Sequence, residues 1–404
     1  MLKFHKLVFS MLLATAFLSC KKSSSNSPLE PIDPVVVTPF VSATAAGSLT
    51  KVEMQQQASL MGFGTALNPL INYSTDFFKI VYRTTYQGKV IEVSGLIGLP
   101  KNGPANPSII SGQHETRFLK SSAPSRFSTN TSTGYELLAA MGYVVVIPDY
   151  IGFGSSESAF HPYYIKEATA AAVVDMIKAS KEYLESKKFT TSSRLFLVGY
   201  SEGGYATLAA QHEIETNPAL GLTLTAAAAG AGAFDLSTML TEVAKSEQSM
   251  GAAYLTYLLM AYNTHYGWNR SLNTIFSEPY AAAIPNLYKG DIDGPAINSK
   301  LTVNLKTLFT PTFSADLITT GKEAVLKTAL RTNSFFDWYP KSLTRLYHGT
   351  EDEIVPYKSS QTTYDAFIAA GATKVTLTPV RGTHVTAASS MMVDVLPWIM
   401  SIDK

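Results

Sequence analysis

Ser201 lies in a short segment whose residue types and spacing suit a serine nucleophile. Residues 195–205 read LFLVGYSEGGY, so an apolar run ends at Gly199, Ser201 follows, and Gly203 comes two residues later. Strand formers before the serine and helix formers after it predict a sharp strand-to-helix turn that exposes the hydroxyl. Glycine is needed at the flanking positions because a side chain there would collide with neighbouring backbone. The segment makes Ser201 the candidate nucleophile, the alternative being a plain turn capped by this serine.

A serine hydroxyl needs a base within hydrogen-bond reach, and the base needs a carboxylate that holds its tautomer. His384, in the loop RGTHV between the last predicted strand and the last predicted helix, is the candidate base. Asp352, in the segment HGTEDEIVP after the preceding strand, is the candidate acid. Asp235, at the end of the strand that follows the nucleophile helix, is the alternative acid. The chain order serine, aspartate, histidine is one in which such a triad occurs.

A tetrahedral intermediate needs two N–H donors for its oxyanion. The amide of Glu202, at the start of the helix after Ser201, is the first candidate donor, and the helix dipole adds to its effect. The second is expected in the loop after the third predicted strand, where His114 and Glu115 replace the histidine–glycine pair often found there. If Glu115 and Glu202 both lie near the nucleophile, we expect the two carboxylates to approach each other and share a proton.

Strands alternate with helices on both sides of these candidate residues, which predicts an α/β fold with a mostly parallel sheet covered on both faces. This alternation of strands and helices stops between residues 235 and 340, where the sequence is mainly helix-like. We interpret 235–340 as a helical cap inserted after the sixth strand of a core formed by 49–234 and 341–404, because the core is incomplete without the strands on both sides. A second independent domain is the alternative. The predicted strands are 77–86, 90–99, 109–110, 143–147, 195–198, 222–229, 343–347 and 374–379.

The N-terminus has the features of an export signal. Lys3 and Lys6 precede an apolar stretch, residues 7–18, that is too short to span a bilayer but fits a signal peptide, predicted over 1–19. The segment Phe17–Cys20 resembles a bacterial lipobox, which implies that Cys20 is lipidated and anchors the protein to a membrane of the bacterial cell envelope. The alternative is an ordinary cleaved signal. Residues 20–48, rich in serine, proline and threonine, are expected to form a linker.

The amino-acid composition and net charge limit the classes of function that this protein can have. Hydrophobic residues make up 46% of the 404 residues and charged residues 16%, as in a globular protein with a sizeable core. A net charge of +1 gives no reason to expect nucleic acid as a partner. The sequence has no H-E-x-x-H motif, no cysteine cluster and no glycine-rich dinucleotide loop after its first strand, so we expect neither a metal nor an organic cofactor.

The Ser201 turn, the Asp352 loop and the His384 loop together resemble the α/β-hydrolase superfamily. The segments 149–155 (DYIGFGS), 161–163 (HPY) and 338–340 (WYP) are similar to the secretory lipase family within it. The resemblance implies an α/β-hydrolase fold and hydrolysis of carboxylic esters through an acyl-enzyme, with the helical cap shaping the acyl pocket.

The main functional hypothesis is a serine esterase or lipase in which Ser201 attacks, His384 transfers the proton and Asp352 orients the histidine. Its substrate would be an ester of a small molecule, a lipid or a polysaccharide. A serine peptidase on the same scaffold is the first alternative, and it would need a pocket carboxylate for a peptide amino terminus. A non-catalytic surface-binding protein is the second, and the complete set of three residues argues against it.

Overall fold

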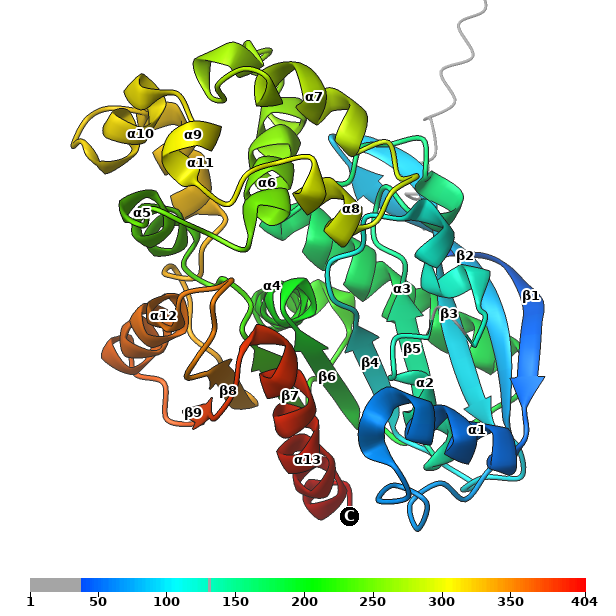
Figure 1. Cartoon of the computed structure of the whole chain (residues 1–404). Coiled ribbons are helices and arrows are strands. Elements are labelled where there is room, and N and C mark those ends of the chain that lie inside the picture. The colour runs from blue at the N-terminus through cyan, green and yellow to red at the C-terminus, as the bar shows by residue number, and fades with distance from the viewer. Residues whose placement is uncertain (1–37, 130–131) are drawn as a thin grey trace, which may run out of the picture. The chain divides into compact units, whose positions relative to one another are not determined.

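The computed structural model describes residues 38–129 and 132–404. The expected signal peptide, the lipidated Cys20 and the linker up to residue 37 lie outside the described residues. Within them, nine strands form one sheet in the order β1-β2-β3-β5-β4-β6-β7-β8-β9 (Figure 1). The strands are β1 (Phe40–Leu49), β2 (Thr75–Tyr86), β3 (Lys89–Pro100), β4 (Ile109–Gln113), β5 (Val144–Pro148), β6 (Leu195–Tyr200), β7 (Ala226–Gly230), β8 (Leu343–Gly349) and β9 (Val375–Val380).

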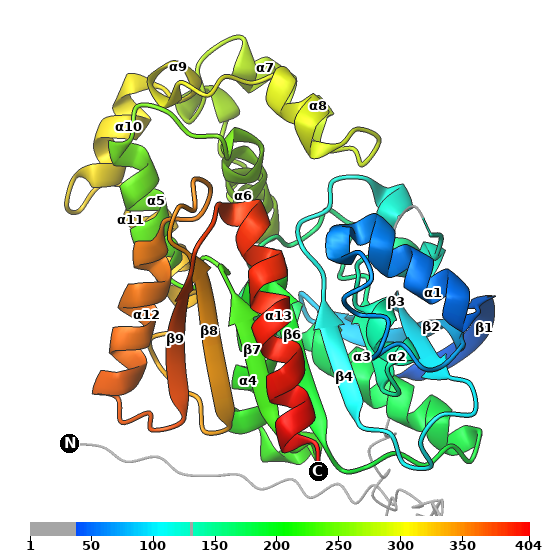
Figure 2. The ribbon, with the colours of Figure 1, turned by 60° about the horizontal axis from the view of Figure 1, so that its bottom comes forward.

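Strands β5, β4, β6, β7, β8 and β9 are neighbours in this order and pair in parallel. The pairs β1–β2, β2–β3 and β3–β5 are antiparallel. Helices cover both faces of the sheet, as the alternation of strands and helices predicts (Figures 1 and 2). Helices α1, α2 and α13 pack on one face, and α3, α4 and α12 on the other. These helices are α1 (Lys51–Ala58), α2 (Glu136–Ala140), α3 (Lys166–Ser186), α4 (Glu202–Thr216), α12 (Tyr357–Ala369) and α13 (His384–Ile402).

The central strands are apolar on both sides because both sides are covered. Along β5, Val144 and Val146 belong to the hydrophobic cluster on the α3 and α4 face, and Val145 and Ile147 to the cluster on the α2 and α13 face. Successive side chains of a strand point to opposite faces, so a strand buried on both faces reads as a continuous apolar run. This double burial fixes the carboxyl ends of the strands, from which the candidate site residues project.

The folded part begins earlier than the sequence indicated. The expected linker extended to residue 48, but Phe40–Leu49 forms β1, which pairs antiparallel with β2. Its alanine- and serine-rich sequence has little strand character, and backbone pairing with the edge of β2 supplies its order. The ring of Phe40 lies 5.8 Å from that of Tyr183 on α3, which ties the start of the strand to the core.

The segment between β7 and β8 is helical and lies beyond the carboxyl ends of the central strands (Figure 2). Because β1 adds a strand, the insertion follows the seventh strand rather than the sixth. Its buried side chains, such as Leu255 and Leu258, belong to the same hydrophobic cluster as the α3 and α4 face of the sheet. Its helices are α5 (Leu236–Lys245), α6 (Ala252–His265), α7 (Tyr280–Leu287), α8 (Gly294–Ser299), α9 (Leu305–Leu308), α10 (Pro311–Ile318) and α11 (Ala324–Thr332).

Among the helices of the described ranges, α13 alone combines the length and apolar composition of a membrane-spanning helix. It packs against the sheet through residues such as Met391, Val395 and Ile399, which is also how a core helix of this composition behaves.

Candidate active site

Ser201 occupies the sharp turn between β6 and α4 that the sequence predicts. Its backbone has φ 58° and ψ −126°, a conformation that side-chain-bearing residues rarely adopt. A Cβ atom on Gly199 would lie 2.0 Å from the carbonyl oxygen of Gly203, and one on Gly203 would lie 1.9 Å from that of Gln113. Both flanking positions therefore require glycine, and the turn holds the serine side chain at the end of β6.

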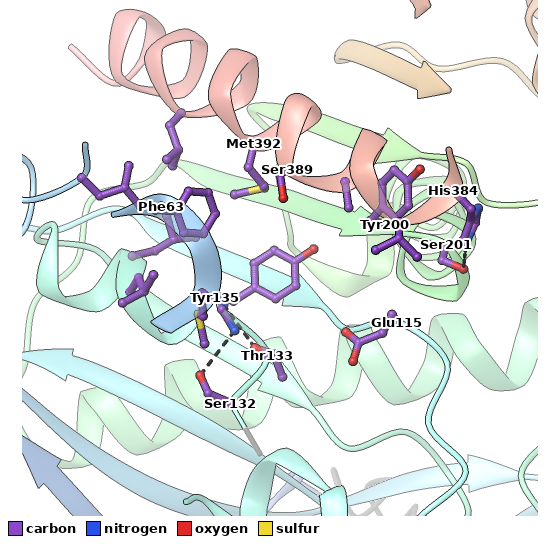
Figure 3. A pocket seen from close by; sticks show the side chains of 18 of the residues that line it. Phe63, Glu115, Ser132, Thr133, Tyr135, Tyr200, Ser201, His384, Ser389 and Met392 are labelled. Carbon is purple, nitrogen blue, oxygen red and sulfur yellow. Dashed lines mark hydrogen bonds between the residues drawn. The ribbon is translucent and has the colours of Figure 1, made fainter. Parts of the chain in front are cut away.

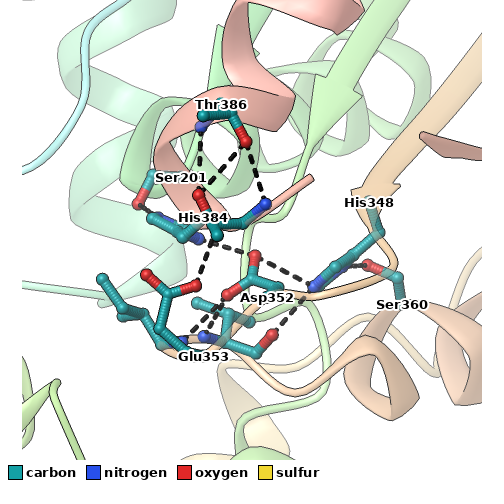
Figure 4. A network of polar contacts seen from close by, with 10 residues as sticks. Ser201, His348, Asp352, Glu353, Ser360, His384 and Thr386 are labelled. Carbon is teal, nitrogen blue, oxygen red and sulfur yellow. Dashed lines mark hydrogen bonds and ion pairs between the residues drawn. The ribbon is translucent and has the colours of Figure 1, made fainter. Parts of the chain in front are cut away.

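His384 joins the two other candidate triad residues by hydrogen bonds (Figure 4). Its Nε2 lies 2.9 Å from Ser201 Oγ, and its Nδ1 lies 2.7 Å from Asp352 Oδ2. Asp352 accepts at Nδ1, so this nitrogen carries the proton and Nε2 presents its lone pair to the serine hydroxyl. His384 is the first residue of α13, not a loop residue as expected, because Thr383 caps the helix directly before it.

A second histidine holds the far side of Asp352. Nε2 of the buried His348 lies 3.3 Å from Asp352 Oδ2 and 2.8 Å from the carbonyl oxygen of Val355. Both neighbours are acceptors, so Nε2 carries the proton and Nδ1 accepts from Ser360 Oγ at 2.7 Å. No role for His348 followed from the sequence, although its spacing from Asp352 in the HGTED segment is the signal that could have found it.

The environment of Asp352 favours the charged carboxylate. Burial raises the pKa of Asp352, but hydrogen bonds from His348 and His384 outweigh burial and bring this pKa well below its usual range. Backbone N–H groups of Ile354 and Val355 donate to Oδ1 at 3.0 and 2.8 Å. The carboxylate is therefore ionised and fixed in orientation next to His384.

The other acidic side chains near these loops have different partners. Asp235, the alternative acid, caps α5 by accepting from the Thr238 amide and also accepts from Thr362 Oγ1. Glu353 accepts from the backbone N–H of His384 at 3.1 Å, and Glu351 is exposed. In the described part of the chain, no group of three or more His, Cys, Asp or Glu side chains is placed to hold a metal ion.

The candidate oxyanion donors lie around Ser201 in different ways. Glu202 is the first residue of α4, so its backbone N–H has no partner within the helix. Glu115 lines a cavity together with Ser201. The buried His114 ring instead contacts the Tyr150 ring in a tilted arrangement, with ring centroids 4.2 Å apart, and its Nδ1 lies 2.7 Å from the Glu115 carbonyl oxygen. Burial is the main cause that lowers the pKa of His114 to about 3, so its ring is neutral and braces the loop.

The expected proton sharing between Glu115 and Glu202 is wrong, because the two carboxylates have separate partners. Glu202 is buried, and its Oε1 lies 2.6 Å from Nε2 of the buried His161. The Glu115 side chain is half exposed and pairs with Arg117 at 3.3 Å. His161 stands in the HPY segment, residues 161–163, but its pairing with Glu202 did not follow from the sequence.

Ser201 lines two cavities of different size. The larger has a volume of about 410 Å³ and lies mainly between α13, the segment around α2 and residues 61–67 (Figure 3). The smaller, of about 30 Å³, lies on the cap side against residues such as Leu255 and Leu258. Tyr254 is the single cap residue among the described residues that line the larger cavity. The resemblance implied a pocket shaped by the cap, but the core supplies most of the larger wall because residues 61–67 and α13 enclose it.

The mostly parallel sheet, the serine at the turn after a central strand, and the acid and base after the last two strands define an α/β-hydrolase. The family model of the secretory lipases matches residues 124–402, and the chain belongs to that family. Membership makes the protein a hydrolase that acts on esters.

Solved structures share this fold over most of their length. A Legionella pneumophila protein superposes with a TM-score of 0.83 at 26% identity, covering 91% of this chain and 98% of its own. The rice cell wall degrading esterase LipA from Xanthomonas oryzae, in a ligand-bound form, gives a TM-score of 0.77 at 24% identity over 88% and 95%. Candida antarctica lipase A in its closed state gives 0.67 at 18% identity over 91% and 82%. No curated protein sequence matches the chain.

Proposed function

We propose that this protein hydrolyses carboxylic esters through a Ser201–His384–Asp352 triad and an acyl-enzyme intermediate. The observation that carries the proposal is the position of His384, whose two ring nitrogens lie 2.9 Å from Ser201 Oγ and 2.7 Å from Asp352 Oδ2. This geometry matches the roles of nucleophile, base and orienting acid.

In the first half of the reaction, Ser201 Oγ attacks the ester carbonyl carbon while His384 Nε2 accepts the hydroxyl proton. Asp352 stabilises the imidazolium that forms, because its carboxylate stays ionised beside Nδ1. The Glu202 N–H and an N–H of the loop at Glu115 are the proposed oxyanion donors. His384 then protonates the departing alkoxide, and a water molecule repeats the sequence on the acyl-enzyme to release the carboxylic acid.

The peptidase alternative has less support from the carboxylates described around Ser201. A peptide amino terminus requires a pocket carboxylate, yet Glu202 is paired with His161 and Glu115 with Arg117. Each of these two carboxylates is thus engaged by a partner side chain, and we retain ester hydrolysis as the one proposed reaction.

Hydrolysis of p-nitrophenyl esters from acetate to palmitate, by protein lacking residues 1–20, tests the proposal. Ser201→Ala should lose activity by several orders of magnitude because no acyl-enzyme can form. Ser390→Ala, an exposed serine outside the cavity, is the matched control and should keep full activity. Equal rates for Ser201→Ala and the parent protein would overturn the proposed mechanism.

We also propose that Cys20 carries the lipid that anchors the protein to the bacterial cell envelope. A lipidated protein is held at a membrane surface without a spanning segment. Cys20→Ser should move the protein from the membrane fraction to the soluble fraction. Membrane association that persists in Cys20→Ser would contradict lipid anchoring at this residue.

A further inference from the structure

The larger cavity at Ser201 is apolar along its length away from the catalytic residues. Helix α13 forms one wall, and residues near α2 and residues 61–67 form the opposite wall (Figure 3). Side chains that give it this character are Phe63, Leu67, Leu138, Met141, Met392 and Leu396.

Some of the polar groups that line this cavity are already bonded elsewhere. Among the described lining residues, Glu115 is the one carboxylate, and it pairs with Arg117. The hydroxyls of Ser132 and Thr133 both donate to the carboxylate of Glu136, at 2.8 and 2.9 Å. The hydroxyls of Tyr135 and Ser389 also line the cavity, but most of its wall is apolar, and a hydrocarbon chain needs no polar partner.

The two cavities differ enough in size to constrain the substrate. A cavity of about 30 Å³ holds only about one or two water-sized groups, so the cap side of Ser201 receives a short group. The cavity of about 410 Å³ accommodates a chain of many atoms. An ester that fills both has one long arm and one short arm on either side of the carbonyl carbon.

We propose that the cavity between α13, the α2 segment and residues 61–67 binds the hydrocarbon chain of the substrate. Chain-length specificity is then set from the core side, by residues such as Ser389 and Met392 on α13, and not by the cap. This inference rests on the proposed ester hydrolysis. The favoured substrates are esters with one extended apolar arm, not acetyl or feruloyl groups on polysaccharides.

The physical basis is the burial of methylene groups against the apolar wall. Each methylene buried in the cavity should raise kcat/KM by up to about fourfold, until the chain reaches the end of the cavity. The rise applies to whichever arm of the ester enters the cavity. Two substrate series separate the arms: p-nitrophenyl esters of lengthening acyl chains, and acetates of lengthening linear alcohols followed by acid release.

Ser389→Trp tests the site with little risk to folding, because Ser389 is exposed and lines the cavity. Its indole should fill the cavity and lower the ratio of kcat/KM for long-chain esters to kcat/KM for short esters by about tenfold or more. Ser390→Trp is the matched control, since Ser390 is exposed on the same helix but is not a lining residue. Met392→Ala should enlarge the cavity and shift the optimum to longer chains.

The outcomes separate this inference from the proposed function. A chain-length preference in either series that Ser389→Trp abolishes and Ser390→Trp preserves supports the site, and the responsive series identifies the arm. Short esters hydrolysed with no chain-length dependence, or a preference that Ser389→Trp leaves unchanged, would overturn the site while ester hydrolysis stands. Absence of activity on every ester would instead remove the proposed function.

Discussion

Nε2 of His161 lies 2.6 Å from Oε1 of Glu202, and both side chains are almost completely buried. His161 Nδ1 lies 2.7 Å from the carbonyl oxygen of Ile151, so the proton on Nδ1 is committed to that carbonyl. The short distance between Nε2 and the carboxylate requires one further proton between them. Whether this proton resides on the nitrogen or on the oxygen, the pair has no net charge. Because Glu202 adjoins Ser201, the pair prevents an unbalanced negative charge next to the oxyanion of the proposed mechanism.

His161→Leu should therefore be strongly destabilising, because it leaves the Glu202 carboxylate buried without its partner. We expect the free energy of unfolding to fall by about 3 kcal/mol, with a lower kcat. The double substitution His161→Leu/Glu202→Leu should recover most of the lost stability, since it removes both polar groups. Urea unfolding of the single and double variants measures this coupling. Additive losses in the double variant would show that the two side chains act independently.

His348 is expected to act as a positioning residue for Asp352. Loss of its N–H bond to the carboxylate in His348→Leu should cost about 2 kcal/mol of unfolding free energy and lower kcat by about tenfold. His348→Gln can still present an N–H donor and should recover part of the kcat. Ser360→Ala removes only the bond to Nδ1 and should have a smaller effect. A kcat equal to that of the parent protein in His348→Leu would disprove the positioning role.

Gly203→Ala places two opposing effects in one substitution. Alanine favours a helix over glycine by about 1 kcal/mol, but its Cβ would lie 1.9 Å from the Gln113 carbonyl oxygen. The clash should win, with a net loss of about 2 kcal/mol in stability and a reduced kcat, because Gln113 leads into the Glu115 loop. Gly251→Ala, whose nearest neighbour atom would lie 3.3 Å away, is the control. Greater stability of Gly203→Ala in thermal unfolding would contradict this prediction.

Buried, neutral His114 should make the protein sensitive to mild acid. Its pKa is lowered to about 3 in the folded state, so below its usual value of 6.5 the unfolded chain binds a proton that the folded chain does not. Stability then decreases as the pH falls, by about 2 kcal/mol between pH 6.5 and pH 5. Urea unfolding at pH 7 and pH 5 should show a smaller difference for His114→Asn than for the parent protein. An equal difference in both proteins would exclude His114 as the source.

Features determined by short segments of sequence could be predicted. The need for glycine around Ser201 is a property of five consecutive residues, and the structure shows the backbone contacts behind it. Asp352 and His384 could be chosen as candidates because each follows one of the last two strands. Parallel strands end at the same edge of a sheet, so residues after β8 and β9 come within 2.7 Å of each other.

Features that depend on packing between distant segments could not be predicted. Strand β1 has a weak sequence pattern, and its extended conformation depends on pairing with β2. Glu202 and its partner His161 are 41 residues apart, and no periodicity connects them. The larger cavity is lined mainly by residues 61–67, the α2 segment and α13, so the sequence of the cap carried no information about its main walls.

The most direct test of the central claim is the site of covalent labelling by a p-nitrophenyl alkylphosphonate. Attack of Ser201 Oγ on phosphorus expels p-nitrophenolate and leaves a stable phosphonyl ester on the serine. We predict one added phosphonyl group in the intact mass, located on the peptide that contains Ser201, with loss of esterase activity in step with labelling. Ser201→Ala should remain unlabelled. Labelling of a different residue, or esterase activity that survives complete labelling of Ser201, would contradict the role of Ser201 as the nucleophile.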